Sequence, residues 1–481
     1  MVVSASKQRA DDFSTFTQRL ILELPICRHL IANEGQRWSK IAFDVRPALA
    51  SGSPSVKSVG ITGQLTGSRA DIIIADDIEV PNNSMTQMMR EKLGEAVKEF
   101  DAVLKPEGKI LYLGTPQCEM SLYNTLTERG YQMRVWTARY PSVEASEKAY
   151  GARLAPMLWD AIANSKTPLD GSPVDPKRFD DDDLLERELS YGRSGFALQF
   201  MLDTTLSDTD RYPLKLSDLM VMSIDKDKAP EKLVYGVMKE VKDLPNVGLR
   251  GDKYYAPEAI VGDYVNYTGS VMVIDPSGRG QDETAYAVVK MLNGYLYVAD
   301  CGGVAGGYSE PTLVKLSNIA KDHKVNVILI ESNFGDGMFT ELLKPIIRKI
   351  YPVTMEEVRH SKQKELRIID TLEPVMNQHK LIIDPKVIQK DFDSVQHHPP
   401  EKAQRYMLTY QMSRITKQRG ALAHDDRLDA LAMGVAYWVE QMAADVDAEI
   451  KERKEALLMQ ELDKFVNGFN VNSKTRANTW I

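Results

Sequence analysis

Short apolar runs that end abruptly in a carboxylate constrain the fold of this chain more than any other feature. Val271–Ile274 leads directly into Asp275, and a glycine-containing turn then returns to Asp282. Val327–Ile330 leads into Glu331 in the same way. Because buried strands read as short apolar runs, we expect each acid at the carboxyl end of a strand. Parallel pairing of the two strands would bring Asp275 and Glu331 to the same edge of a sheet.

A third acidic segment, residues 423–429, opens a helix whose apolar stripe is Leu428, Leu431, Ala432 and Val435. Asp425 and Asp429, four residues apart, flank the edge of this stripe together, and Asp426 lies within reach of the same end. Each acid also has an ordinary structural explanation: Asp275 can begin a turn, Asp425 can cap the helix, and the helix dipole favours Asp426. For His424, a capping or hydrogen-bonded role is the first interpretation and a phosphate contact the second.

As a set, the acids indicate a metal-dependent nuclease. Cutting a phosphodiester with two metals requires converging carboxylates, so that ions about 4 Å apart activate a water and stabilise the leaving oxygen. Magnesium prefers such oxygen ligands. The element order is typical of an RNase H-like domain: a strand ending at Asp275, runs 285–292 and 295–300 joined by Asn293-Gly294, a helix over 310–323, a strand over 326–331, and the acidic helix.

The first half of the chain has the pattern of the acidic element of a nucleotide-hydrolysing domain, although an apolar strand that ends in two aspartates also occurs in many other α/β proteins. Residues 1 to about 205 alternate apolar runs with amphipathic segments, the pattern of parallel strands joined by helices. The strand Ala70–Ala75 ends in Asp76 and Asp77, the form of a Walker B element. The next strand, Lys109–Gly114, runs into a small hydroxyl-bearing turn that suits sensing of a γ-phosphate. No G-x-x-x-x-G-K-[ST] loop occurs, and the first residues already resemble a strand of the same sheet.

Length and charge limit the other possibilities. The 481 residues exceed what one core usually supports, so we expect two domains and a tail. A net charge of −8 argues against a protein that coats nucleic acid in general. The basic run 402–419, with Tyr406 and Tyr410 interleaved, suits either a contact with a DNA backbone or a solvated pair of strands. Three separated cysteines, with no signal peptide or apolar span, predict a reduced cytosolic protein.

These motifs together resemble those of the terminase large subunits of tailed phages, most closely the DNA maturase B type of short-tailed phages. The resemblance covers nearly all of the chain, through segments 55–69, 70–77, 113–115, 271–283, 331–337 and 423–429. It implies an α/β chain in which an incomplete P-loop NTPase-like parallel sheet domain precedes an RNase H-like nuclease domain. The expected divisions are an ATPase-like domain lacking Walker A (1–205), a linker or accessory region (206–268), the nuclease (269–440), and a C-terminal helix and tail (441–481).

The resemblance also implies roles for individual residues. In the ATPase half, Asp76 is the magnesium-associated acid, Asp77 replaces the usual catalytic glutamate with Glu79 as the alternative, and Gly114 and Thr115 belong to the coupling motif. The implied metal ligands of the nuclease are Asp275, Asp282, Glu331, Asp426 and Asp429, with Asp425 left open, and all but Asp282 are also implied to be catalytic. The implied cofactors are Mg²⁺ or Mn²⁺, and ATP.

By the same resemblance, the chain pumps double-stranded DNA into a procapsid and cuts concatemeric DNA. The implied partners are DNA, a portal protein, a small terminase subunit, the procapsid and further copies in a ring, in the host cytoplasm during phage assembly and with no membrane. The motor half is expected to be truncated before the Walker A loop, and its ATPase impaired. Two alternatives remain: a stand-alone resolvase-like nuclease, and a non-catalytic subunit that docks on the portal.

Overall fold

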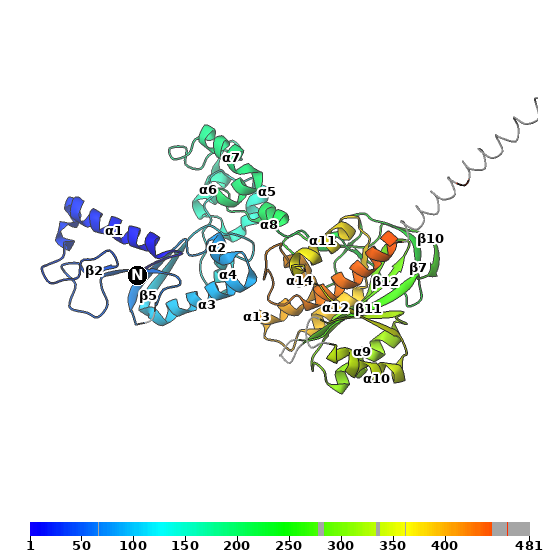
Figure 1. The fold of residues 1–481 in the computed structure, drawn as a ribbon. Helices are drawn as coiled ribbons and strands as arrows, with labels where there is room; N and C mark the ends of the chain where they lie inside the picture. Colours follow the sequence, from blue (N-terminus) through cyan, green and yellow to red (C-terminus); the bar gives the residue numbers. More distant parts are fainter. Residues whose placement is uncertain (66, 278–282, 333–336, 361, 445–458, 460–481) are drawn as a thin grey trace, which may run out of the picture. The chain divides into compact units, whose positions relative to one another are not determined.

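The computed structural model describes residues 1–444 and 459, apart from residues 66, 278–282, 333–336 and 361 (Figure 1). The chain forms two compact units, each with a core of its own. The first comprises Met1–Pro213, Leu249–Gly251 and Arg414–Ala423. The second comprises Leu214–Gly248, Asp252–Ser413 and the described residues from His424 to residue 444.

A largely parallel sheet organises the first unit, in the order β2-β3-β1-β4-β5. Only the short β2 pairs antiparallel, with β3. The strands are β1 (Val2–Ser4), β2 (Ala42–Phe43), β3 (Val56–Gly60), β4 (Ala70–Asp76) and β5 (Leu104–Leu113). The strands expected around residues 70–75 and 109–114 are therefore β4 and β5. Apolar side chains of these strands pack with α3 (Gln87–Val103) and α4 (Leu122–Glu128) in one buried cluster.

The rest of the first unit is helical. Asp180 caps α7 (Asp181–Gln199), where its side chain accepts a hydrogen bond from the Asp183 backbone N–H, as the run of four aspartates suggests. The remaining segments are α1 (Lys7–Glu23), η1 (Pro25–Leu30), α2 (Pro81–Ser84), α5 (Val143–Ala145), η2 (Ser146–Tyr150), η3 (Gly151–Arg153), α6 (Pro156–Asn164), α7 (Asp181–Gln199) and α8 (Thr205–Arg211).

A mixed sheet forms the centre of the second unit, in the order β15-β14-β11-β12-β13-β16-β6-β9-β8. Its bounds are β6 (Met220–Val221), β8 (Glu240–Val241), β9 (Tyr254–Tyr255), β11 (Gly269–Asp275), β12 (Thr284–Leu292), β13 (Tyr295–Val304), β14 (Val327–Glu331), β15 (Thr354–Val358) and β16 (Leu381–Ile383). The predicted hairpin is present, because β12 and β13 pair antiparallel across Asn293 and Gly294, both at positive φ. The predicted parallel pairing of β11 with β14 is also present.

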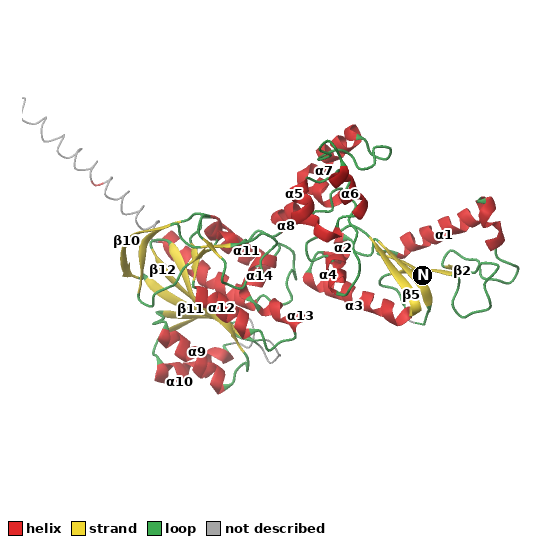
Figure 2. Cartoon of the chain, turned by 180° about the vertical axis from the view of Figure 1, so that it is seen from behind, coloured by secondary structure: helices red, strands yellow, loops and turns green. Residues whose placement is uncertain are grey.

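Helices cover both faces of this sheet (Figure 2). Apolar side chains of α9 (Glu310–Asp322) and α10 (Met338–Ile350) pack with Met272 and Ile274 on one face. The helix over residues 426–444 covers the other face, where Gly434 lies so close that a Cβ there would meet Val289 at 2.9 Å. The remaining helices are η4 (Leu216–Asp218), α11 (Lys364–Asn377), α12 (Pro385–Ser394), α13 (Pro400–Ala403), η5 (Gln404–Tyr406) and α14 (Leu408–Arg414).

Two expected divisions differ from the structure. The segment 206–268, expected as a linker, supplies β6, β8 and β9 to the main sheet, and also β7 (Lys228–Val234) and β10 (Ala259–Asn266), which pair with each other. Of these strands, β6, β8 and β9 have two residues each and carry no periodicity, so their pairing depends on the partners that the fold provides. The last helix continues past residue 440 to 444, and the amphipathic helix expected over 445–465 lies outside the described residues. No described helix is long and apolar enough to span a bilayer.

Candidate functional site

The structure brings together three acids that are far apart in the sequence. Asp275 ends β11 and Glu331 ends β14, and the parallel register that pairs Ile274 with Ile330 places the two acids side by side. Asp429 comes from the first turns of the helix 426–444. One carboxylate oxygen from each of the three lies within 4.8 Å of the others. The predicted convergence of strand ends and helix start is therefore present for these three residues.

Burial makes the negative charges at this cluster costly. Asp429 is fully buried. Burial raises the pKa of Asp275 well above its usual range, Lys364 opposes that shift, and the charges of Glu331 and Asp429 add to it. Burial also raises the pKa of Glu331, and the charge of Asp429 raises it further. A divalent cation would relieve this repulsion.

Two cations from α11 contact the cluster, and neither is among the residues predicted from the sequence. Lys364 Nζ lies 2.7 Å from Asp425 Oδ1, 3.2 Å from Asp429 Oδ2 and 3.7 Å from Asp426 Oδ1. Arg367 Nη2 lies 2.7 Å from Asp429 Oδ1, and it donates a hydrogen bond of 3.0 Å to Oδ2. A signal was available: Lys364 is the first residue of its helix, where the helix dipole disfavours a cation unless acids compensate it.

The remaining predicted nuclease residues lie in different places. Asp425 and Asp426 contact Lys364 at the edge of the cluster but are not among the three acids whose oxygens converge within 4.8 Å. Asp282 lies outside the described residues. The helix begins at residue 426, which puts Asp425 at the N-cap position, while its side chain reaches Lys364. Asp425 therefore occupies the N-cap position of the helix and also forms an ion pair with Lys364.

The three converging acids fit a divalent cation. Their ligands are all carboxylate oxygens, which Mg²⁺ and Mn²⁺ accept. Asp429 Oδ1 is buried and accepts no hydrogen bond of suitable geometry from any described residue, although Arg367 is near. An oxygen in that state has a lone pair available for a metal. Asp275, Glu331 and Asp429 would hold such an ion.

The basic run 402–419 is helical and partly buried, so the strand-pair interpretation is wrong. It contains η5 and α14, and both Tyr410 and Arg414 are buried. Tyr406 instead lies in a column of rings, with its centroid 4.3 Å from that of His398 and 4.0 Å from that of His424. His424 is thus a stacked residue directly before Asp425.

In the first unit, the two predicted motifs lie on adjacent strands. β4 and β5 pair so that Asp76 is opposite Leu113, and the Asp77 backbone N–H donates to the Leu113 carbonyl at 2.9 Å. Gly114 and Thr115 therefore follow beside the acids. Burial raises the pKa of Asp76, and the charge of Asp77 raises it further. Asp77 has a φ of 45° and forms an ion pair of 3.2 Å with Arg9.

Glu79, the alternative catalytic acid, is engaged in holding a loop. Its side chain is buried, and its two carboxylate oxygens accept hydrogen bonds from the backbone N–H groups of Gln117 at 3.1 Å and Leu122 at 2.6 Å. These bonds connect the segment after Asp77 to the segment after Thr115. A carboxylate so occupied is poorly placed to activate a water, so Asp77 is the better candidate.

Gly114 has a packing reason as well as a predicted functional one. A Cβ at this position would lie 2.0 Å from the Tyr123 hydroxyl, closer than any side chain tolerates. That hydroxyl donates to the Leu113 carbonyl at 3.3 Å. Tyr123 therefore fixes the end of β5 only because residue 114 has no side chain.

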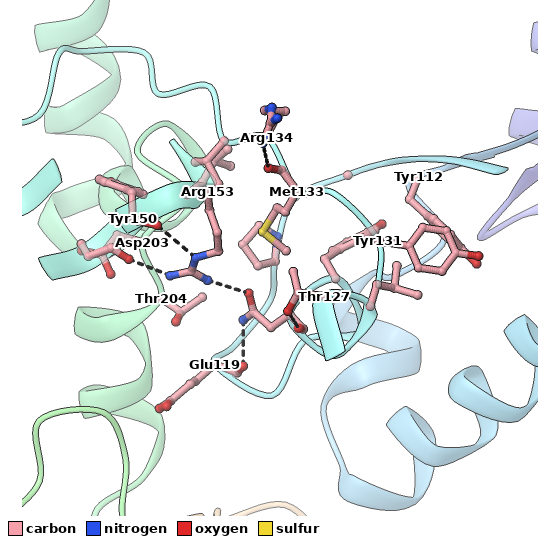
Figure 3. Close-up of a pocket in the computed structure, with 18 of the residues that line it drawn as sticks. Tyr112, Glu119, Thr127, Tyr131, Met133, Arg134, Tyr150, Arg153, Asp203 and Thr204 are labelled. Atoms are coloured by element: carbon pink, nitrogen blue, oxygen red, sulfur yellow. Dashed lines mark hydrogen bonds between the residues drawn. The ribbon is translucent and has the colours of Figure 1, made fainter. Parts of the chain in front are cut away.

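A cavity of about 530 Å³ in the first unit is lined by Gly114 and Tyr123 together with Glu119 and Arg153 (Figure 3). Arg153 donates three hydrogen bonds to residues that line this cavity. Its Nη2 donates to the Ala149 carbonyl, its Nε to the Tyr150 carbonyl and its Nη1 to the Asn124 side chain. These bonds connect α4 to η2. The guanidinium acts here as a structural brace of the cavity.

The second unit is similar to a known protein family and to several solved structures. The family model for the ribonuclease H-like domain of the bacteriophage T7 terminase matches residues 274–381. Solved structures with similarity include the human cytomegalovirus terminase nuclease domain, Mn soaked and inhibitor bound (14% identity, 36% of this chain, 83% of that chain, TM-score 0.27). Another is the large terminase nuclease from thermophilic phage G20c (13% identity, 47% of this chain, 98% of that chain, TM-score 0.26). The second unit therefore contains an RNase H-like domain, by the family-model match.

A curated relative extends the match to nearly the whole chain. The large terminase subunit of Enterobacteria phage T3 is 48% identical over 460 residues, which are 94% of this chain and 78% of the relative. The chain belongs to the terminase large subunit family. The resemblance drawn from the sequence motifs is confirmed.

Proposed function

We propose that the second unit is a metal-dependent endonuclease that cuts concatemeric double-stranded DNA during genome packaging. The observation that carries this proposal is the convergence of Asp275, Glu331 and Asp429 oxygens within 4.8 Å. A bound divalent cation would polarise the scissile phosphate and lower the pKa of an attacking water. Asp275, Glu331 and Asp429 would hold that cation, and Lys364 and Arg367 supply positive charge beside the three acids.

Within this proposal, Asp426 takes part at the edge of the site, and Asp282 remains a candidate ligand by its position in the sequence shortly after Asp275. Mg²⁺ or Mn²⁺ is the proposed metal. Family membership supports the rest: DNA, a portal protein, a small terminase subunit and a procapsid as partners, a ring of copies, and the host cytoplasm as the place of assembly.

The nuclease proposal is tested with supercoiled plasmid DNA. We expect the protein to convert it to nicked and linear forms with Mg²⁺ or Mn²⁺, and to leave it intact with excess EDTA. The products are separated on agarose and quantified over time. Intact plasmid in the presence of both metals would overturn the proposal.

For the first unit, we propose a nucleotide site at the carboxyl ends of β4 and β5, with Asp76 and Asp77 as the acids and Gly114 and Thr115 as the neighbouring turn. Asp77 N–H donates to the Leu113 carbonyl, which supports communication between the two motifs. The sequence has no G-x-x-x-x-G-K-[ST] loop to wrap the phosphates of ATP.

Little or no ATP turnover is therefore expected from the 481-residue chain alone. Phosphate release, measured with and without DNA, checks this expectation, and Asp76→Ala is the control. Robust turnover that Asp76→Ala abolishes would contradict it and would show that this chain holds nucleotide phosphates by other groups.

A further inference from the structure

The acids of the proposed metal site come from two kinds of element, two paired strands and one helix. Asp275 and Glu331 lie on β11 and β14, whose relative position is fixed by a ladder of backbone hydrogen bonds. Asp429 and Asp426 lie on the helix 426–444, which packs on the sheet without such a ladder. The Trp438 indole N–H donates to the Val289 carbonyl at 3.1 Å, well beyond the acidic end of the helix. The acidic end needs an anchor of its own.

Besides the Lys364 and Arg367 ion pairs and a hydrogen bond of 3.0 Å from the Leu428 N–H to Gln411 Oε1, Arg427 anchors this end. Its side chain is buried, although it lies between Asp426 and Asp429 in the sequence. Its Nε and Nη2 donate to the two carboxylate oxygens of Glu283 at 2.5 and 2.8 Å, a bidentate ion pair. Its Nη1 donates to Asp391 Oδ1 at 2.7 Å. Because the guanidinium is planar and is held on both edges, its orientation is closely defined.

Both acids that hold Arg427 are fixed in turn. Glu283 directly precedes β12, in which Ala285 pairs with Asp275, so Glu283 lies close to the start of the strand that pairs with β11. The buried Asp391 of α12 accepts hydrogen bonds from the backbone N–H groups of Leu408 and Thr409 at 2.9 and 3.2 Å. Arg427 therefore connects the acidic helix to the start of β12 on one side and to α12 and α14 on the other.

Burying three charges together is costly, and apolar residues of similar volume would often stabilise a core as well. The network of Arg427, Glu283 and Asp391 is therefore explained better by a role in positioning the helix than by a gain in folding stability. We propose that Arg427 is a positioning residue of the metal site, which uses Glu283 and Asp391 to set the first turns of the helix against β11 and β14. This inference rests on the proposed metal-dependent nuclease.

The test measures Mn²⁺ binding to the full chain by titration calorimetry, together with plasmid cutting as a function of Mn²⁺ concentration. The variants are Arg427→Lys, which keeps the charge but loses the fork, and Glu283→Gln, which keeps the shape but loses the charge. The matched control is Lys390→Met. Lys390 is next to Asp391 on α12, and it pairs with Asp300 at 2.6 Å instead of with the acids that hold Arg427.

Both network variants should weaken Mn²⁺ binding about 10-fold, in the range seen when groups that orient metal ligands are removed. Cutting should recover toward the wild-type rate at saturating Mn²⁺. Lys390→Met should lower the unfolding temperature without changing the Mn²⁺ dependence. Unchanged Mn²⁺ affinity in Arg427→Lys and Glu283→Gln, or an equal loss in Lys390→Met, would overturn the inference while wild-type cutting keeps the proposed function. Wild-type protein that binds no Mn²⁺ would overturn both.

Discussion

Replacing Asp275 by asparagine should reduce metal-dependent cutting of plasmid DNA about 10³-fold, a loss of ~4 kcal/mol of transition-state stabilisation. The change keeps the shape of the side chain but removes one of the three carboxylates that converge at the site. The measurement is the initial rate of plasmid cutting at several concentrations of Mg²⁺ and Mn²⁺. The matched control is Asp263→Asn, an exposed acid of β10.

The same substitution should not destabilise the metal-free protein. Burial and neighbouring acids raise the pKa of Asp275, so its ionised form is disfavoured in the folded state. For a carboxyl whose folded pKa is raised, the folded state holds the proton more tightly, and stability falls as the pH rises from the ordinary pKa toward the raised one. A neutral amide at this position removes that loss, so the unfolding temperature of Asp275→Asn near neutral pH should stay equal or rise. Wild-type cutting by Asp275→Asn would remove this residue from the site.

Replacing Lys364 by alanine should make the stability of the protein depend strongly on metal. Lys364 Nζ lies 2.7 to 3.7 Å from oxygens of Asp425, Asp426 and Asp429. Removing one partner of a buried ion pair leaves uncompensated charge, which costs about 3–5 kcal/mol when burial is complete. About a third of the Lys364 side chain is exposed (34%), and solvent screening reduces the expected loss to ~2 kcal/mol.

Divalent metal should restore most of that loss. A cation that binds the folded state stabilises it by about 2.7 kcal/mol at 100 times its dissociation constant. Thermal unfolding is followed in EDTA and in excess Mg²⁺ or Mn²⁺, and the exposed Lys362→Ala is the control for loss of one positive charge nearby. An unfolding temperature of Lys364→Ala that does not rise when Mg²⁺ or Mn²⁺ replaces EDTA would contradict the assignment of this cluster as a cation site.

Several parts of the fold could be predicted because local patterns encode them. The Asn293-Gly294 dipeptide favours positive φ at both positions, and the structure has φ of 51° and 77° there. The apolar runs before Asp275 and Glu331 become β11 and β14. The short strands β6, β8 and β9 could not be predicted, since two residues carry no period and take their conformation from the strands beside them.

The candidate sites also contain features that the sequence predicts and contacts that it does not reveal. A carboxylate at the end of an apolar run or at the start of a helix is visible in the sequence, and Asp275, Glu331 and Asp429 were all proposed from such positions. Glu79 was proposed as an alternative ATPase acid because its type and position suited the role, and nothing in the sequence reveals that the backbone N–H groups of Gln117 and Leu122 occupy its side chain.

The sequence by itself determined which acids lie at strand ends and at a helix start, because strand and helix periods are local and each acid interrupts one of them. Only the tertiary structure decided which charges accompany those acids. Lys364 and Arg367 approach Asp429 from α11, a helix far upstream in the sequence, and Arg427 turns away from its acidic neighbours to Glu283 and Asp391. Such contacts depend on packing between distant segments, and no spacing along the chain records them.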